Sequence, residues 1–340
     1  MKYAWMKPVL ASILGLALAS SAWAQKTQIL VYTALETDQL KAYEQGFNKE
    51  YPDIEIKWVR DSTGVITAKL LAEKGNPQAD AVMGVAASSL ALLDSNGMLQ
   101  PYAPSNLAAI TAKYRDKKNP PAWFGMDVWG ATICFNTVEA AKKNLPKPET
   151  WKDLTKPIYK GQIVMPNPAS SGTGYFDVTA WLTLWGDDNG KGGGWKYMDA
   201  LHENIAQYTH SGSKPCTLAG SGEYLMGISF EYRANSNKAK GAPIDLVFPT
   251  VGLGWDLESF GIQNGTKKLA DWASSKNAAL LYGKNFAITA VPGVAEPLPN
   301  VPKDYESRLV NVDFAWAANN REKILAEWTK RYDSKSEPKK

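Results

Sequence analysis

Short apolar runs alternate with amphipathic runs through the first third of the chain, and this alternation most strongly constrains the fold. Residues 27–33 (TQILVYT) read as a buried strand, and residues 36–51 carry apolar side chains at helical spacing. The order then repeats, with strands at 54–59 and 79–84 and helices at 62–74 and 87–96. Strands joined by helices over short links predict an α/β fold with mostly parallel, doubly wound sheets.

A second unit of the same kind follows a break at Pro120, Pro121 and Gly125. The pattern predicts strands at 128–135, 161–165, 227–230 and 244–248, and helices at 175–185, 197–205, 222–225, 269–275 and 320–332. We therefore predict two lobes, residues 25–125 plus about 250–290 and residues 126–249 plus about 291–332, and a disordered charged tail at 333–340. Ligands of such sheets bind beyond the carboxyl ends of strands, which places the expected site between the lobes.

The first 24 residues have the pattern of a secretory signal peptide. Lys2 and Lys7 precede an apolar run at 8–19 that is too short to span a bilayer, and Ala22-Trp23-Ala24 supplies small residues at a cleavage point. A buried N-terminal helix or a membrane anchor is the alternative. Removal of this segment near Ala24 lowers the formal charge from +4 to +2, which gives no reason to expect nucleic acid as a partner.

The two cysteines, Cys134 and Cys216, both lie after the signal peptide. Disulfides persist outside the cytoplasm, so export favours a Cys134–Cys216 bridge. Two buried free thiols are the alternative, because the sequence does not show whether the two Cα atoms approach each other.

Enzyme signatures are missing from the sequence. It has two histidines, His202 and His210, and no HExxH, CxxC, GxSxG or phosphate-binding P-loop motif. The histidines and cysteines are not clustered as a zinc site requires, so no metal or cofactor is expected. A hydrolase triad that combines His210 with Ser211 or Ser213 stays open as the rival reading, although adjacent residues seldom supply the geometry of a triad.

Two segments combine small hydroxyl residues with glycine at the expected first turn of a helix. One is Ser62-Thr63-Gly64 and the other is residues 170–174 (SSGTG). The first turn of a helix offers unpaired N–H groups and a positive dipole end, and glycine allows close backbone approach. Each turn alone is better explained as an ordinary N-cap. One such turn in each predicted lobe favours an anion held between them.

Three acidic residues lie near predicted strand ends or domain boundaries: Glu36, Asp127 and Glu231. Each alone reads as a cap or a surface partner. A carboxylate beside an anion is unfavourable unless the ligand also carries a cation, because like charges repel. Taken together, these residues and the two hydroxyl-rich turns indicate a zwitterionic ligand.

The order of several segments resembles the extracellular solute-binding proteins of ABC importers. These segments include VYTALE, DSTGVITAKLLAEKGNPQADAV, TWKDLTKPIYKGQIVMPNPASSGTG and SGEYLMGISFEYRA, and the resemblance covers nearly all of the chain after residue 24. It implies a type II periplasmic binding protein, with two hinged lobes that close on a solute and deliver it to a membrane permease. It further implies a monomeric periplasmic protein that is not an enzyme.

Within this family the chain is similar to the branch that includes ferric-ion and sugar-phosphate carriers. Iron carriers have a histidine at the position of Glu36, two tyrosines at Glu231 and Tyr232, and an acidic ligand near Val85, so the iron-binding set is broken here. Their anion-binding Ser-Gly pair and the position after it are retained as Ser171, Gly172 and Thr173. WVRDSTGVITAKLLAEK and MPNPASSGTGYFDV are most similar to proteins that bind 2-aminoethylphosphonate.

This ligand carries a phosphonate at one end and an ammonium at the other. We expect the phosphonate to contact Ser62, Thr63, Gly64, Ser171, Gly172 and Thr173, with Thr33 and Ser211 as weaker candidates. We expect Glu36, Asp127 or Glu231 to bind the ammonium, and Tyr232 or Trp129 to form the pocket wall. Arg60 and Arg233 are further candidates for the phosphonate, although their flanking positions are more typical of surface residues. A sugar phosphate, phosphate, a polyamine or iron are the alternative ligands.

Overall fold

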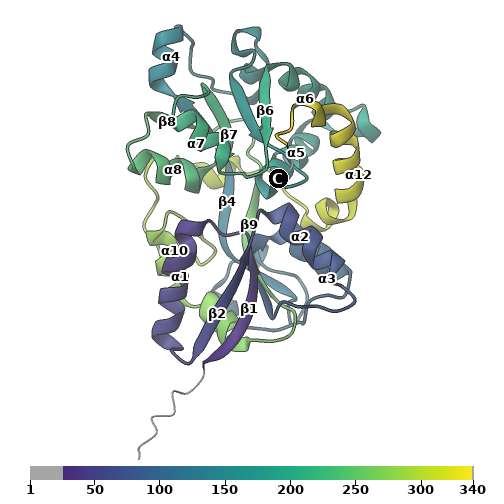
Figure 1. The fold of residues 1–340 in the computed structure, drawn as a ribbon, viewed down its shortest axis with the longest axis vertical. Coiled ribbons are helices and arrows are strands. Elements are labelled where there is room, and N and C mark those ends of the chain that lie inside the picture. Colours follow the sequence, from purple (N-terminus) through teal and green to yellow (C-terminus); the bar gives the residue numbers. More distant parts are fainter. Residues whose placement is uncertain (1–25, 339–340) are drawn as a thin grey trace, which may run out of the picture.

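In the part of the chain that the computed structural model describes, residues 26–338, ten strands form one curled sheet that runs through two lobes (Figure 1). The predicted signal peptide, residues 1–24, lies outside the described residues. The strand order along the sheet is β2-β1-β3-β9-β4-β7-β5-β6, and β8 and β10 also pair with β4. We call the half that carries β1 to β3 lobe 1, and the half that carries β5 to β8 lobe 2.

Lobe 1 begins with the three strand–helix repeats that the sequence predicts. Strands β1, β2 and β3 are parallel, and Thr27 of β1 lies opposite Ile54 of β2. Helices α1, α2 and α3 each follow one of these strands. The bounds are β1 Thr27–Thr33, α1 Thr37–Glu50, β2 Ile54–Arg60, α2 Thr63–Ala72, β3 Ala81–Ala86 and α3 Ala87–Ser95.

One long strand, β4 (Trp123–Asn136), belongs to both lobes, and every residue in it is buried. Its first half pairs antiparallel with β9 (Trp255–Ile262), which also pairs with β3. Its second half pairs antiparallel with β7 (Met226–Phe230) and β8 (Ile244–Val247). The predicted boundary at residues 125 and 126 therefore falls inside a strand, and β4 and β9 make the lobe 1 sheet mixed.

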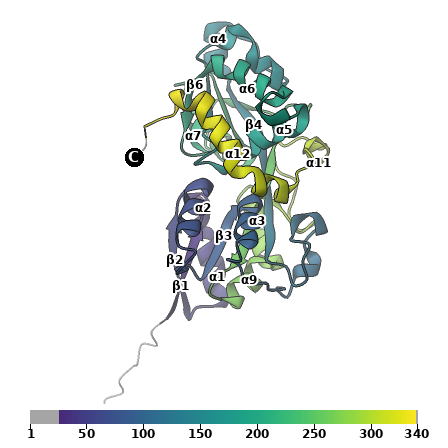
Figure 2. The same cartoon turned by 90° about the vertical axis from the view of Figure 1, so that its right-hand side faces the viewer.

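Lobe 2 repeats the pattern with β5 parallel to both β6 and β7. Its helices pack on the two faces of these strands, and α12 runs from α3 of lobe 1 along lobe 2 towards β6 (Figure 2). The remaining bounds are α4 Thr137–Lys143, β5 Ile163–Pro166, α5 Gly172–Trp185, α6 Gly193–Asn204, β6 Ile205–Thr209, α7 Lys214–Gly220, α8 Glu231–Ala239, α9 Lys267–Ala273, α10 Lys276–Lys284, β10 Ile288–Thr289, α11 Tyr305–Arg308 and α12 Phe314–Tyr332.

Each lobe has its own apolar core. The lobe 1 core gathers aliphatic and aromatic side chains of β1 to β4, β9 and the helices packed on them, including Phe47 of α1 and Phe260 of β9. The lobe 2 core contains buried tryptophans, of which Trp151, Trp181 and Trp195 are almost fully enclosed. These aromatic residues form the cores of the two lobes, with large apolar areas removed from water.

The predicted disulfide between Cys134 and Cys216 is confirmed. It joins the second half of β4 to α7, with the two Cα atoms 5.3 Å apart. It fastens the helix that begins beside the inter-lobe pocket to the strand that both lobes share.

Two predictions about the chain are wrong. Residues 222–225 form a turn rather than a helix, because the helical segment, α7, ends at Gly220 and Gly222 adopts a φ of 80°. Residues 333–338 are not a disordered tail: a short 3₁₀ turn at Asp333–Lys335 continues α12, and Ser336 pairs with Tyr208 next to β6. Backbone hydrogen bonds to the edge of lobe 2 hold this charged segment in place.

Candidate functional site

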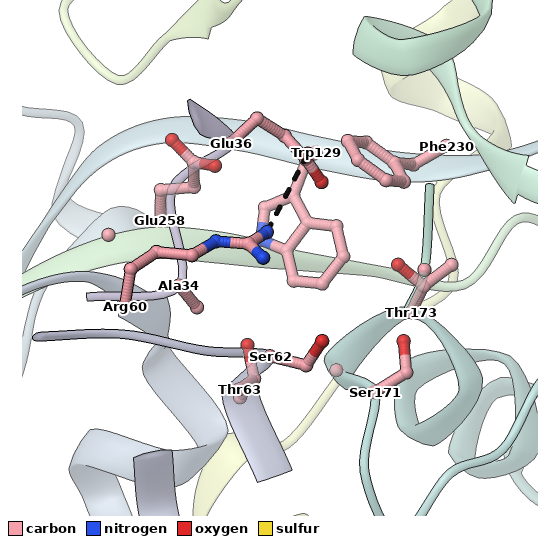
Figure 3. A pocket seen from close by; sticks show the side chains of 13 residues that line it. Ala34, Glu36, Arg60, Ser62, Thr63, Trp129, Ser171, Thr173, Phe230 and Glu258 are labelled. Carbon is pink, nitrogen blue, oxygen red and sulfur yellow. Dashed lines mark ion pairs between the residues drawn. The ribbon is translucent and has the colours of Figure 1, made fainter. Parts of the chain in front are cut away.

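A polar pocket with about 400 Å³ of empty space lies between the lobes (Figure 3). This volume includes space open to solvent, and the cavity itself measures about 30 Å³, well below the range of pockets that enclose a whole ligand. Lobe 1 and lobe 2 both contribute side chains, and β4 and β9 form its back. The residues that line it are Ala34, Glu36, Arg60, Ser62, Thr63, Gly84, Trp129, Ser171, Gly172, Thr173, Gly212, Phe230 and Glu258.

The lobe 1 side of the pocket is the N-terminus of α2. Strand β2 ends at Arg60 and α2 begins at Thr63, so Ser62 occupies the N-cap position. Its hydroxyl makes no capping bond within the described residues. The amide of Gly64 donates to the carbonyl of Ser170 in lobe 2 at 2.8 Å. Ser62 and Thr63 therefore face the pocket, whereas Gly64 joins the lobes and does not line the pocket.

The lobe 2 side is the N-terminus of α5, which faces α2. Ser171 is the N-cap, and its hydroxyl accepts a long hydrogen bond of 3.4 Å from the amide of Gly174. Gly172 and Thr173 are the first two helical residues and line the pocket. A Cβ atom on Gly172 would lie 2.9 Å from the hydroxyl oxygen of Thr63. This close approach requires glycine and brings two positive helix ends together.

An arginine from lobe 1, Arg60, enters the same pocket, so it does not take the surface position that is typical of its flanking residues. Its guanidinium Nε donates to the carbonyl of Leu35 at 3.0 Å, and its Nη2 lies 3.6 Å from Glu36 (Figure 3). The Arg60 side chain is 28% exposed. It adds a positive charge close to the hydroxyl groups of Ser62 and Thr63.

Arg233 is also not a free surface residue. It lies on α8 in lobe 2, its side chain is 11% exposed, and it reaches Glu36 at 3.0 Å and Asp38 at 3.1 Å in lobe 1. Tyr232 donates from its hydroxyl to the same Asp38 at 3.1 Å. We call Arg233, Glu36 and Asp38 the inter-lobe ion network. It exists only when the two lobes are together.

Carboxylates gather at the back of the pocket. Glu258 of β9 lines the pocket and lies opposite Asp127 of β4 in the antiparallel pairing. Glu231, at the start of α8, accepts a hydrogen bond from the amide of Gly130 at 2.7 Å. Within residues 26–338, one oxygen of each of these three carboxyl groups is buried without a hydrogen-bond partner.

Burial determines the protonation of these groups. Removal from water raises the pKa of Glu231 to about 8. Burial also raises the pKa values of Asp127 and Glu258, and the negative charge of Glu258 raises that of Asp127 further. Two adjacent buried carboxylates do not both ionise easily, so the Asp127–Glu258 pair holds a proton near neutral pH unless a cation is close.

The structure brings seven of the predicted site residues to this pocket: Glu36, Ser62, Thr63, Trp129, Ser171, Gly172 and Thr173. Six others do not line it: Thr33, Gly64, Asp127, Ser211, Glu231 and Tyr232. The hydroxyl of Thr33 accepts from the amide of Leu35, and that of Ser211 bonds to Ser213. Asp127 and Glu231 lie in the layer behind the pocket.

Sequence reasoning did not identify Glu258 as a pocket residue. Its signal was an acidic residue within the largely apolar segment WDLESFGI, where burying a charge is costly unless the charge is paired or hydrogen-bonded. Gly212 was also missed, and a Cβ atom there would lie 2.3 Å from the hydroxyl oxygen of Thr173.

Within residues 26–338, no helix has both the length and the apolar character that a membrane span needs. Across the same range, no three His, Cys, Asp or Glu side chains are grouped so that they could hold a metal ion.

Two α/β lobes joined by shared strands, with a polar pocket between them, define the fold of type II periplasmic binding proteins. Comparison with known proteins identifies the family. Residues 76–314 match the model of the bacterial extracellular solute-binding proteins, and this chain belongs to that family. Members of the family bind small solutes for ABC importers, and known members are exported proteins.

Three relatives illustrate the relationship. An uncharacterized protein of Haemophilus influenzae is 29% identical over 92% of this chain and 93% of its own length. A probable ABC transporter periplasmic-binding protein of Sinorhizobium fredii, y4fP, is 28% identical over 76% of this chain and 73% of its own. The solved structure of AfuA from Actinobacillus pleuropneumoniae, with fructose-6-phosphate bound, has a TM-score of 0.83 and 28% identity, and covers 91% of this chain and 99% of AfuA.

Proposed function

We propose that this chain is the periplasmic solute-binding component of an ABC importer and that it captures 2-aminoethylphosphonate between its lobes. In this proposal a signal peptide is removed near Ala24, and the mature protein acts as a monomer that delivers its ligand to a membrane permease and catalyses no reaction. The observation that carries the proposal is the meeting of two helix N-termini, one from each lobe, beside Arg60 and opposite Glu258, an acid with no cationic partner among the described residues.

The phosphonate end is supported by the donors of α2, α5 and β2. The hydroxyl groups of Ser62, Thr63 and Thr173 face the pocket, and the amides of Gly172 and Thr173 belong to the unpaired first turn of α5. Arg60 supplies a charged donor that matches the geometry of phosphonate oxygens. A group with three oxygens and up to two negative charges suits this many preorganised donors.

The ammonium end is supported by the different surroundings of the two carboxylates in the pocket. Glu36 is neutralised by Arg233 at 3.0 Å and by Arg60 at 3.6 Å. Glu258 has no cationic partner among the described residues and is backed by Asp127. We therefore assign the ammonium to Glu258. The sequence had instead suggested Glu36, Asp127 or Glu231 as its partner. Trp129 forms the wall between the two ends.

A sugar phosphate is the second candidate, because AfuA is 28% identical to this chain and its structure contains fructose-6-phosphate. The same donors would hold its phosphate. A neutral sugar, however, leaves the buried carboxylates at the back of the pocket without a cation. Iron is less favoured, because Glu36 is already engaged by two arginines.

Titration calorimetry on the mature protein tests the proposal with 2-aminoethylphosphonate, ethylphosphonate, fructose 6-phosphate, inorganic phosphate and ferric ion. We expect 2-aminoethylphosphonate to bind most tightly, and ethylphosphonate at least about tenfold more weakly because the ammonium contact is lost. Tighter binding of fructose 6-phosphate would overturn the ligand assignment. Glu258→Gln is expected to remove the preference for the amine and to leave ethylphosphonate binding almost unchanged.

A further inference from the structure

Residues 333–338 pack beside the pocket loops of lobe 2. After α12 ends near β6 (Figure 2), Ser336 pairs with Tyr208, and the amide of Glu337 donates to the carbonyl of Tyr208 at 2.8 Å. Lys335 donates from Nζ to the carbonyl of Ile205 at 2.8 Å. Because β6 is the edge strand of the sheet, residues 333–338, which we call the C-terminal segment, cover an otherwise open edge.

The C-terminal segment contacts two loops. The side-chain amide of Asn167, at the start of the loop before α5, donates to the hydroxyl of Ser336 at 3.0 Å. The carboxylate of Glu337 accepts from the backbone amide of His210 at 2.5 Å and forms an ion pair with Lys214. One short segment therefore holds the loop before α5 and the loop between β6 and α7.

These two loops carry the lobe 2 donors of the pocket. The amide of Ser171 donates to the carbonyl of Asn167 at 2.8 Å, and the hydroxyl of Ser170 donates to the carbonyl of His210 at 2.9 Å. Gly212, two residues after His210, packs against Thr173 so closely that a Cβ atom would clash with its hydroxyl. Ser336 therefore bonds to Asn167, whose carbonyl holds the amide of Ser171. Glu337 bonds to His210, which lies two residues before the glycine that packs against Thr173.

The side chain of Glu337 is nearly buried and stays ionised. It is 10% exposed. Burial alone would raise the pKa of Glu337, but the amide of His210 and the ammonium of Lys214 hold it below its usual value. A carboxylate that stays ionised in a nearly buried place binds its two donors strongly.

We propose that Ser336 and Glu337 are positioning residues for the anion half of the ligand site, and that they preorganise the donors of α5 without touching the ligand. This inference rests on the proposed function, since it assumes that the pocket binds a phosphonate or phosphate group. Preorganised donors bind more tightly because less loop motion is lost on binding.

The test compares Glu337→Ala with Glu337→Gln, which keeps an acceptor for the amide of His210 but not the charge. Glu322→Ala, an exposed acid on α12, is the matched control. Dissociation constants for methylphosphonate and 2-aminoethylphosphonate are measured by calorimetry, and melting temperatures are measured without ligand. We expect Glu337→Ala to weaken both ligands by the same factor of about tenfold, Glu337→Gln by about threefold, and Glu322→Ala not at all.

The equal loss for both ligands separates a role at the anion end from a general weakening of the pocket, and the partial rescue by glutamine separates it from loss of fold. Unchanged affinity in Glu337→Ala, or a loss confined to 2-aminoethylphosphonate, would overturn the inference and leave the proposed function standing. If the wild-type protein binds neither phosphonate nor fructose 6-phosphate, the proposed function fails and the inference fails with it.

Discussion

The inter-lobe ion network predicts that Arg233→Met weakens ligand binding without weakening the fold of either lobe. Arg233 and Glu36 are 11% and 14% exposed, and a hydrogen bond to a charged group in such surroundings contributes about 1.5–3 kcal/mol. Asp38 is 38% exposed, so its pair with Arg233 adds less than about 1 kcal/mol. Glu36 keeps Arg60 as a partner, which limits the loss to about 1.5–2 kcal/mol. The dissociation constant is then expected to rise about 10- to 30-fold.

Calorimetry gives the dissociation constant, and stopped-flow measurement of ligand release shows whether the loss lies in the off-rate, as expected for a contact made after closure. Lys240→Met is the matched control, because Lys240 also reaches Asp38, at 3.3 Å, but is 64% exposed. We expect it to change the dissociation constant about twofold or less. The effect of Arg233→Met is expected to shrink in high salt. An unchanged dissociation constant, or equal losses in the two variants, would refute the reasoning.

Three further predictions follow from the described contacts. Gly64→Ala places a Cβ atom 2.1 Å from the carbonyl oxygen of Ala169, so calorimetry is expected to show ligand binding weakened at least about tenfold; normal affinity would contradict this. The melting temperature of the unliganded protein is not expected to fall, since alanine favours a helix. Replacing Cys134 and Cys216 by alanine opens a loop of sequence separation 82 and is expected to lower the free energy of unfolding by about 4 kcal/mol in urea titrations; a loss under about 1 kcal/mol counts against it. Burial raises the pKa of Glu231 to about 8 in the folded state, so the folded protein keeps a proton that the unfolded chain releases. Between about pH 5.5 and pH 7.5 the wild type should therefore lose about 2.5 kcal/mol of unfolding free energy relative to Glu231→Gln; parallel pH profiles of the unfolding free energy would contradict this.

Local patterns predicted the first three strand–helix repeats because each element carries its own periodicity and its own terminating residues. The predicted strand at 27–33 coincides with β1, and the predicted strand at 54–59 ends one residue before β2 does. No strand was predicted at β9, since the acidic residues of WDLESFGI interrupt its apolar pattern. The sharing of β4 between two lobes also left no local signal, because periodicity does not identify pairing partners.

In the candidate site, too, the features set by local sequence were predictable and those set by distant contacts were not. The turns at Ser62 and Ser171 were predictable, because small hydroxyl residues next to glycine mark the start of the helix that follows them. The roles of Arg60 and Arg233 were not, because both depend on Glu36, which is distant from each of them in sequence. Residues 333–338 were misjudged from composition alone, since a charged segment becomes ordered when a sheet edge offers it hydrogen bonds.

The position of β9 between β3 and β4 has a consequence for the order in which the molecule assembles. Strands β5 to β8 and the part of β4 that they pair with all lie before residue 248, so lobe 2 has its strands in one continuous stretch of chain. Lobe 1 begins earlier in the sequence, yet its sheet lacks a central strand until residues 255–262 arrive. Until those residues arrive, lobe 1 has an open edge on β3, whereas the strands of lobe 2 can already pair and its core is completed later by α12. Folding of lobe 1 is expected to be the slower step because its contacts span a longer stretch of sequence.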